Sequence, residues 1–420
     1  LVVSMLVNER FTSNSTSVLA ARLAYFLDLT GPSMAINTSC SSGLVALHEA
    51  CLSLRYGDCD TAVVAGASLM SSAHDYLAME KATMLAPDRT CYAFDRRANG
   101  MVPGEAVAVL VLRRLPDAER DGHRVHATIL GSGINYDGRT NGITAPSGEA
   151  QSRLLRSVYE RHGIGPDTLD YVVAHGTGTR VGDPIEVNAL ADAFGSSTDR
   201  TGFCALTSIK PNIGHSMAAS GLVNLIALMS AMRHETIPPS INCEELSDYI
   251  DWDASPFFVN REPRHWPATT GRPRRGAVSS FGVSGTNAHV VLQAYDERPG
   301  GSPRAEPHHH RHLLLLSAKD EEALTRRLRD LADYLEKGTE DAGSLASVSR
   351  TLMTGRFHFA HRCALVVQDR ANAIRLLREA AAGTTLPRVY RSRVARRFAP
   401  NQTIHQAVDE VVRASRAKRD

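Results

Sequence analysis

One cysteine and two histidines lie in turns of the kind where a side chain can do chemistry. Cys40 follows an apolar segment and precedes a helical pattern, while His175 and His215 each follow a predicted strand. Backbone N–H groups and the positive end of a helix dipole stabilise a thiolate at a helix start, which lowers the pKa of a cysteine there. A nucleophilic thiol with two imidazoles is a recurrent set for acyl transfer. The alternative is structural: an unreactive core cysteine and two hydrogen-bonded histidines.

The segments around Cys40 predict a strand, a turn, a helix and a second strand. The apolar run 34–39 predicts the first strand, and Gly57 is a natural stop for the helix. The helix is predicted from four apolar residues at helical spacing: Leu44, Leu47, Cys51 and Leu54. Residues 60–66 predict the second strand. Cys40 is therefore expected at a sharp turn onto a helix.

A glycine-rich loop over 175–184 has a competing interpretation. Gly176, Gly178 and Gly182 could cradle the pyrophosphate of a dinucleotide. A dinucleotide-binding unit also needs a second strand that ends in Asp or Glu about 20 residues further on, and residues 196–202 precede the next strand instead. The pattern therefore disfavours a nicotinamide-dependent oxidoreductase.

Strands and helices alternate up to Leu292, which predicts an α/β fold. The run 105–112 is unbroken and β-branched, as is typical of a strand buried on both faces. Further strands are predicted over 125–133 and 170–174, and a strand, tight loop and strand over 275–292. Helices are predicted over 17–27, 77–85, 150–161, 185–194 and 218–233.

Two of the predicted helices begin with nearly the same six residues. Residues 42–47 read Ser-Gly-Leu-Val-Ala-Leu, and residues 220–225 read Ser-Gly-Leu-Val-Asn-Leu. Each stretch follows a turn of small residues. We interpret the match as the trace of an internal duplication that packs two related helices together at the centre of the molecule.

The composition changes after residue 296. Residues 297–312 are rich in Pro, Gly, Arg and His, which predicts a linker with a solvated histidine run. Residues 313–420 predict a small α/β domain whose basic tail ends in a solvated helix. Its first elements are expected as a strand over 313–317, a helix over 321–337 and a strand over 364–367. The expected domains are therefore 1–296 and 313–420.

Bulk composition describes an ordinary soluble globular chain. Its 420 residues are 43% hydrophobic and 22% charged, and the net charge of +2 indicates neither nucleic acid nor a membrane surface as a partner. Seven cysteines without paired CxxC spacing indicate free thiols in the cytoplasm rather than disulfides or a zinc site. No apolar run is long enough to span a bilayer, and the first residues lack signal-peptide features.

Four motifs of small residues, three of which also hold Cys40, His175 or His215, occur in order along the chain. They are Asn-Thr-Ser-Cys-Ser-Ser at 37–42, Ala-His-Gly-Thr-Gly-Thr at 174–179, Lys210 followed by Asn-Ile-Gly-His at 212–215, and Ser-Phe-Gly-Val-Ser-Gly-Thr-Asn-Ala-His at 280–289. On these motifs, residues 17–292 resemble the ketosynthase domain of a modular polyketide synthase. The region after 313 resembles the linker domain that follows such ketosynthases. Three stretches resemble synthases that receive acyltransferase activity from a separate protein: 95–104, 133–146 and 255–260.

The resemblance implies a thiolase-like fold, with two related halves in five layers, and roles for single residues. Cys40 would be the acylated nucleophile, and His175 and His215 would donate N–H bonds to the enolate formed by decarboxylation of a malonyl thioester. Lys210 would organise the histidines electrostatically. The backbone N–H groups of Cys40 and Val283 would form the oxyanion hole. Supporting or pocket positions would be Thr177, Thr179, Asn212, Phe281 and Gly282.

The reaction that the resemblance implies is a decarboxylative Claisen condensation during polyketide chain elongation. It needs no metal and no redox cofactor of the protein's own, because the substrates arrive on the phosphopantetheine of acyl carrier proteins. The expected partners are acyl carrier protein domains upstream and downstream, an acyltransferase, and a second copy of the chain in a homodimer.

Two other functions stay open for the same family. A gatekeeping or transacylating domain would pass chains along without condensing them, and a truncated copy would be a non-catalytic scaffold. The second follows from the start of the chain, because only 39 residues precede Cys40 where family members have a long α/β stretch. We expect a piece of a longer protein, with strands of the first half-fold left unpaired.

Overall fold

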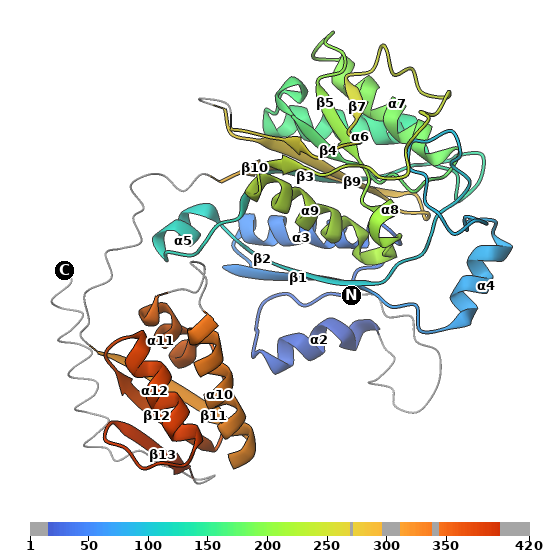
Figure 1. The fold of residues 1–420 in the computed structure, drawn as a ribbon. Helices are drawn as coiled ribbons and strands as arrows, with labels where there is room; N and C mark the ends of the chain where they lie inside the picture. Colours follow the sequence, from blue (N-terminus) through green and yellow to red (C-terminus); the bar gives the residue numbers. More distant parts are fainter. Residues whose placement is uncertain (1–15, 269–271, 296–310, 338–343, 395–420) are drawn as a thin grey trace. The chain divides into compact units, whose positions relative to one another are not determined.

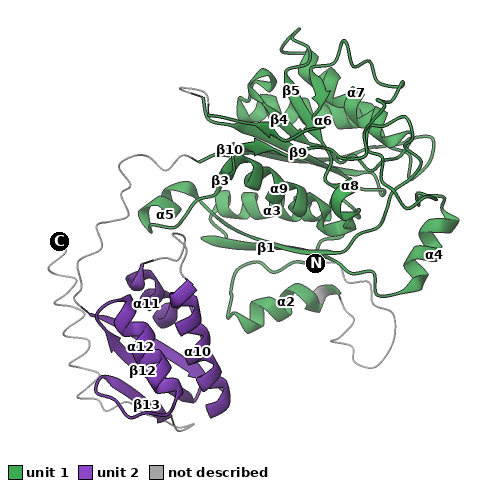
Figure 2. Cartoon of the chain, in the orientation of Figure 1, with its two compact units in different colours: residues 1–300 green, residues 301–420 purple. Residues whose placement is uncertain are grey.

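The structure is a computed structural model that describes residues 16–268, 272–295, 311–337 and 344–394. The chain divides into two compact units, Leu1–Gly300 and Gly301–Asp420 (Figure 2). The division lies inside the predicted linker 297–312. The histidine run of that linker lies outside the described residues, so its predicted solvation stays a prediction.

The elements of unit 1 alternate between strands and helices, which confirms the predicted α/β class. Its helices are α2 (Thr16–Phe26), α3 (Ser42–Tyr56), α4 (Ala73–Lys81), α5 (Leu115–Arg120), α6 (Gly148–His162), α7 (Gly182–Gly195), α8 (Lys210–Ile213) and α9 (Ser220–Arg233). Its strands are β1 (Thr61–Ser68), β2 (Ala106–Arg113), β3 (Ala127–Tyr136), β4 (Tyr171–Val173), β5 (Cys204–Thr207), β6 (Thr236–Ile237), β7 (Phe257–Val259), β8 (Arg264–His265), β9 (Arg275–Phe281) and β10 (Thr286–Ala294).

Two local predictions differ from the structure. The helix predicted over 77–85 begins four residues earlier, at Ala73, because the Ser72 side chain accepts a hydrogen bond from the N–H of His74 and caps the helix there. The strand predicted over 34–39 is wrong, since residues 34–37 have no regular secondary structure. An apolar run becomes a strand only beside a partner, and none of the described strands pairs with these residues.

Six strands of unit 1 form one mixed sheet, in the order β3-β10-β9-β4-β5-β7. Strand β10 is antiparallel to β3 and β9. Strands β9, β4, β5 and β7 are parallel to one another. Parallel strands end at the same edge of a sheet, so the loops after β4, β5 and β9 emerge together. These loops carry His175, His215 and Val283.

This sheet lies between two layers of helices and is buried on both faces. Helices α6 and α7 cover one face, and α3 and α9 cover the other (Figure 1). The side chain of Val172 packs on the α6 and α7 side, whereas those of Tyr171 and Val173 pack on the α3 and α9 side. A second sheet, formed by antiparallel β1 and β2, packs against the far side of α3 and α9.

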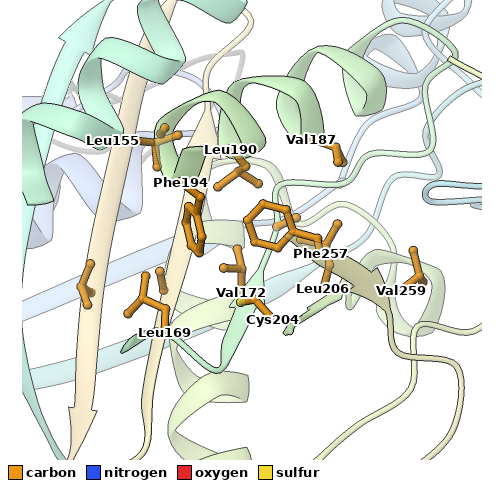
Figure 3. Packing of buried hydrophobic residues seen from close by; sticks show 14 of the residues in the cluster. Leu155, Leu169, Val172, Val187, Leu190, Phe194, Cys204, Leu206, Phe257 and Val259 are labelled. Atoms are coloured by element: carbon orange, nitrogen blue, oxygen red, sulfur yellow. The ribbon is translucent and has the colours of Figure 1, made fainter. Parts of the chain in front are cut away.

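The core above the sheet is a continuous cluster of aliphatic and aromatic side chains (Figure 3). The ring of Phe194 on α7 meets that of Phe257 on β7 edge-to-face, with centroids 4.7 Å apart. Leu190 and Leu206 are fully buried beside them. This packing fixes α7 against the ends of β4 and β5, where the candidate catalytic residues lie.

Helices α3 and α9 pack together at the centre through the residues they share. A Cβ added to Gly43 would lie 3.0 Å from Cγ of Leu222, and a Cβ added to Gly221 would lie 2.5 Å from Cγ of Leu44. The glycine of each helix therefore accommodates the leucine of the other. This reciprocal contact confirms that two related helices meet at the centre, as the repeated hexapeptide predicts.

We expect Gly221→Ala to destabilise the protein by about 1–3 kcal/mol, because the added methyl overpacks the buried Leu44 side chain. Gly195→Ala is the matched control, since Gly195 ends helix α7 and a Cβ there would meet nothing within 4 Å. Chemical denaturation of both variants measures the difference. Equal free energies of unfolding for the two variants would contradict the packing described here.

The expectation that the strand over 105–112 is buried on both faces is wrong. Ala108 is buried against the helices, but Val107, Val109 and Val111 on the opposite face are exposed by 66%, 52% and 66%. A β-branched run is the same whether or not its outer face is covered, so sequence alone could not separate the two cases. Within the described residues this face of β1 and β2 stays accessible.

Unit 2 is a three-stranded antiparallel sheet with helices packed on it. Its elements are β11 (His312–Ala318), α10 (Glu321–Lys337), α11 (Leu345–Thr354), β12 (His361–Val367), α12 (Arg370–Ala381) and β13 (Val389–Arg393), with strand order β11-β12-β13. Strand β11 begins at His312, one residue inside the predicted linker. The helix predicted at the end of the basic tail lies outside the described residues. Among the described helices, none is long and apolar enough to cross a membrane.

Candidate active site

Cys40 lies at the turn that starts helix α3, as predicted. Ser39 before it has a φ of +57°, an uncommon value for a residue with a side chain. The Ser42 hydroxyl holds the turn, because it accepts a hydrogen bond from the N–H of Thr38 at 2.9 Å and donates one to the carbonyl of Ser39 at 2.6 Å. The hydroxyl of Ser280, on β9, donates to the Cys40 carbonyl at 2.8 Å. The main chain that carries the thiol is therefore held both by its own turn and by strand β9.

His175 and His215 meet Cys40 from the segments that follow two parallel strands, His175 just after β4 and His215 after β5 and the short helix α8. The Nε2 atom of His215 lies 3.1 Å from the sulfur of Cys40. The two imidazole rings are edge-to-face, with centroids 5.3 Å apart and planes at 84°. One donor atom from each of the three side chains lies within 4.8 Å of the other two. The structure thus brings together the three residues on which the acyl-transfer hypothesis rests.

Main-chain bonds fix the position of His215. Its N–H donates to the carbonyl of Val102 at 2.6 Å, and its carbonyl accepts from the N–H of Gly104 at 2.9 Å. A Cβ on Gly104 would lie 2.3 Å from the carbonyl oxygen of Ile213, so a side chain would not fit there. Sequence reasoning gave this segment no place at the site. The one feature of the sequence that could have indicated its role was Gly104, which precedes the strand predicted over 105–112.

Lys210 is a buried residue that contacts the loop of His175. Its Nζ donates a hydrogen bond to the main-chain carbonyl of His175. Burial lowers the pKa of the lysine, and the neighbouring carboxylate of Glu186 opposes that effect. An ammonium group in this position holds the His175 loop and acts electrostatically on both imidazoles.

Two buried carboxylates on the first turns of α7 support the same loop, and sequence reasoning missed both. Glu186 accepts hydrogen bonds from the N–H groups of His175 and Gly176, at 2.7 and 2.8 Å. Asp183 accepts one from the N–H of Gly178 at 3.2 Å, and burial raises its pKa to about 6. A pyrophosphate bound by the glycine-rich loop would need these same N–H groups, which already donate to the two carboxylates. The dinucleotide interpretation of the glycine-rich loop therefore fails.

Burial sets the charge states of the cluster. It raises the pKa of the Cys40 thiol, against the opposing effects of Lys210 and of two main-chain N–H groups. It lowers the pKa of His215 well below its ordinary value, and Lys210 acts in the same direction. The pKa of His175 falls for the same two reasons, with His215 as a third cause. The lowered cysteine pKa expected from the helix start is wrong, because desolvation of the thiol outweighs Lys210 and the two N–H groups.

The main-chain N–H groups of Cys40 and Val283 both interact with the Cys40 sulfur and favour its thiolate. Val283 lies in the turn between β9 and β10, where the N–H of Gly282 donates to the carbonyl of Thr286 at 2.8 Å. A Cβ on Gly282 would lie 2.3 Å from the carbonyl of Thr38, so glycine lets this turn approach the cysteine turn. Both N–H groups therefore interact with the sulfur of Cys40, and their role as an oxyanion hole stays a prediction.

The remaining predicted positions differ in their distance from the cluster. The ring of Phe281 lies edge-to-face with that of His175, with centroids 5.8 Å apart. Thr177 and Thr179 hydrogen-bond to each other through their hydroxyls at 3.0 Å. Asn212 is exposed on the short helix α8. Phe281 thus packs against His175, whereas Thr177 and Thr179 stabilise the loop that carries His175.

The arrangement has the parts that acyl transfer to sulfur requires. A thiol lies within hydrogen-bonding distance of a neutral imidazole, which can accept its proton. Two main-chain N–H donors, those of Cys40 and Val283, interact with the sulfur and favour its thiolate. The second imidazole, of His175, lies edge-to-face with that of His215, with centroids 5.3 Å apart.

Comparison with protein-family models covers most of unit 1 and part of unit 2. Residues 4–118 match the β-ketoacyl synthase N-terminal domain, and residues 126–244 match the β-ketoacyl synthase C-terminal domain. Residues 312–377 match a model described as CurL-like, PKS C-terminal.

Curated relatives match nearly the whole chain. Polyketide synthase ThaG of Burkholderia thailandensis is 52% identical over 369 residues, which is 88% of this chain and 6% of the relative. Polyketide synthase PksL of Bacillus subtilis is 43% identical over 366 residues, or 87% of this chain and 8% of the relative. The chain thus spans less than a tenth of the length of these two relatives.

Solved structures match as well. The ketosynthase from module 6 of the bacillaene synthase of Bacillus subtilis 168 is 42% identical with a TM-score of 0.80, and the match covers 90% of this chain and 65% of that one. The oxazolomycin ketosynthase domain OzmH KS7 of Streptomyces albus JA3453 is 36% identical with a TM-score of 0.80, and the match covers 92% and 66%. These likenesses confirm the expected thiolase-like fold.

Proposed function

Because the chain belongs to the β-ketoacyl synthase family, among the ketosynthases of polyketide synthases, we propose that it condenses an acyl chain on Cys40 with a malonyl group carried by an acyl carrier protein. The observation that carries the proposal is the cluster itself. The donor atoms of Cys40, His175 and His215 lie within 4.8 Å of one another, and buried Lys210 supports them.

The first half of the reaction transfers the acyl chain to the sulfur. The Cys40 thiol gives its proton to Nε2 of His215, at 3.1 Å, and the sulfur attacks the carbonyl carbon of the incoming thioester. The N–H groups of Cys40 and Val283 stabilise the oxyanion. When the carbon–sulfur bond to phosphopantetheine breaks, the proton on His215 goes to the departing thiolate. Both imidazoles are then neutral again.

The second half forms the carbon–carbon bond. The malonyl thioester loses carbon dioxide, and the electron pair of the broken bond becomes an enolate whose oxygen accepts an N–H bond from His175 and, once exchange with solvent has moved the ring proton from Nδ1 to Nε2, one from His215. The enolate carbon attacks the acyl group on Cys40 and displaces the thiolate, which takes up a proton from water. The products are a β-ketoacyl thioester on the carrier protein, carbon dioxide and the free thiol.

We also propose the setting of this activity. The small share of ThaG and PksL that the chain covers supports a place within a much longer synthase, next to acyl carrier protein domains. The sequences of residues 95–104, 133–146 and 255–260 resemble those of synthases that receive acyltransferase activity from a separate protein. This resemblance supports an acyltransferase on a separate protein. Tyr25, Leu29 and Met34 are exposed by 92%, 48% and 56%, which supports a homodimer that covers them. Free cysteines among the described residues support a cytoplasmic location.

A two-step assay with the 420-residue chain tests the proposal. The protein is first incubated with an acyl phosphopantetheine thioester and then with malonyl-acyl carrier protein. Mass spectrometry follows both the adduct on Cys40 and the β-ketoacyl product. We expect the adduct and the product in turn. An adduct without product would favour a transacylating domain, and a chain that forms no adduct would favour a non-catalytic scaffold.

A further inference from the structure

We propose that Cys40, His175 and His215 also form a binding site for a soft divalent cation, Zn²⁺ in the first place, and that the bound cation blocks acylation of Cys40. The inhibitory consequence rests on the proposed function, whereas the metal site does not. Among the residues that the structure describes, these three form the one group of Cys, His, Asp and Glu side chains with converging donor atoms.

The geometry is close to that of a zinc site. Tetrahedral zinc with bonds of about 2.3 Å to sulfur and about 2.0 Å to nitrogen separates a sulfur and a nitrogen ligand by about 3.6 Å. Here Nε2 of His215 is 3.1 Å from the sulfur, and no pair of donor atoms is more than 4.8 Å apart. Zinc spacing therefore requires the distance from the sulfur to Nε2 of His215 to lengthen by about 0.5 Å. The two rings are nearly perpendicular, at 84°.

The ligand set has the composition of an open zinc site. One thiolate and two neutral imidazoles leave a fourth position for water, as in catalytic zinc sites with three protein ligands. Cys40 and His175 are half-buried rather than sealed, so a cation can enter and leave. Binding releases the thiol proton: Zn²⁺ and the thiol become a zinc thiolate and a proton, which passes to the buffer.

The surrounding charges also allow a cation in this position. A zinc thiolate carries one net positive charge, and Lys210 adds a second. The buried carboxylates of Asp183 and Glu186 lie beneath the same loop and can offset both charges. A sulfur bonded to zinc has donated electron density to the metal and is a weaker nucleophile toward a thioester, so the occupied site would be reversibly inhibited.

The test uses the whole chain and the metal alone. Iodoacetamide labelling is followed by peptide mass spectrometry, with and without added Zn²⁺. We expect Zn²⁺ to protect Cys40 from alkylation while Cys59, which lies outside the cluster, is alkylated as before. His215→Ala should need at least about tenfold more Zn²⁺ for the same protection. His48→Ala, which changes a histidine bonded to Ser132 elsewhere, should leave protection unchanged.

Co²⁺ provides a second readout that does not depend on alkylation. We expect a thiolate-to-cobalt charge-transfer band that disappears in Cys40→Ser and persists in Cys59→Ser. A band that is equal in both variants, or a Cys40 labelling rate that saturating Zn²⁺ does not change, would overturn the metal site. A protein that binds metal at Cys40 but never forms a β-ketoacyl product would overturn the proposed function and leave the metal site standing.

Discussion

Replacing Cys40 with Ala is expected to abolish acyl loading and to reduce condensation by at least about a thousandfold, because no other group can form the covalent intermediate. The loss should be complete at the first step, since the sulfur is the atom that bonds to the acyl carbon. Intact-protein mass spectrometry after incubation with an acyl phosphopantetheine thioester measures the adduct directly. Alanine is smaller than cysteine at a half-buried position, so we expect the fold to survive.

Cys51→Ala is the matched control for this variant. Cys51 lies on the same helix, burial raises the pKa of its thiol to about 11, and it is not part of the group formed by Cys40, His175 and His215. Loading should therefore be unchanged in the control. An adduct of normal size in Cys40→Ala would show that another residue is the nucleophile, provided that thermal unfolding shows both variants to be folded.

The sequence predicted the fold well where local pattern and tertiary partners agree. The helix over 321–337 and the strand pair over 275–292 were predicted nearly to their ends, because periodicity, turns and burial point the same way there. The strand over 34–39 failed, since its apolar run has no partner strand among the described residues. Burial on both faces of 105–112 failed for a related reason: whether a second layer covers a strand is a property of the whole protein.

Some residues of the candidate site could be predicted from local motifs, and others could not. The motifs around Cys40, His175 and His215 led to the three reacting side chains, and the strand ends explain why residues so far apart in sequence meet. Glu186 and Asp183 were missed, because a carboxylate on the first turns of a helix usually faces solvent. Only the fold turns these two inward, onto the N–H groups of the glycine-rich loop. The direction of the Cys40 pKa shift also depends on burial, which no local motif reveals.

His175→Ala is expected to leave acyl loading within about twofold of the unchanged protein and to reduce decarboxylation of malonyl-acyl carrier protein by about 100- to 10,000-fold. The imidazole within hydrogen-bonding distance of the cysteine sulfur is that of His215, so removal of His175 leaves the thiol with its base. The enolate, in contrast, loses one of its two N–H donors. Release of carbon dioxide from the malonyl group, measured beside the acyl adduct, separates the two steps.

His215→Ala sharpens this prediction because the two histidines differ in their distance from the sulfur. Without His215 the buried thiol has no imidazole within hydrogen-bonding distance, so loading should fall together with decarboxylation. His48→Ala removes a buried imidazole outside the cluster and should affect neither step. Normal condensation by His175→Ala would refute the roles assigned here. Equal loading by the two cluster variants would instead show that the 3.1 Å contact between His215 and Cys40 does not serve proton transfer.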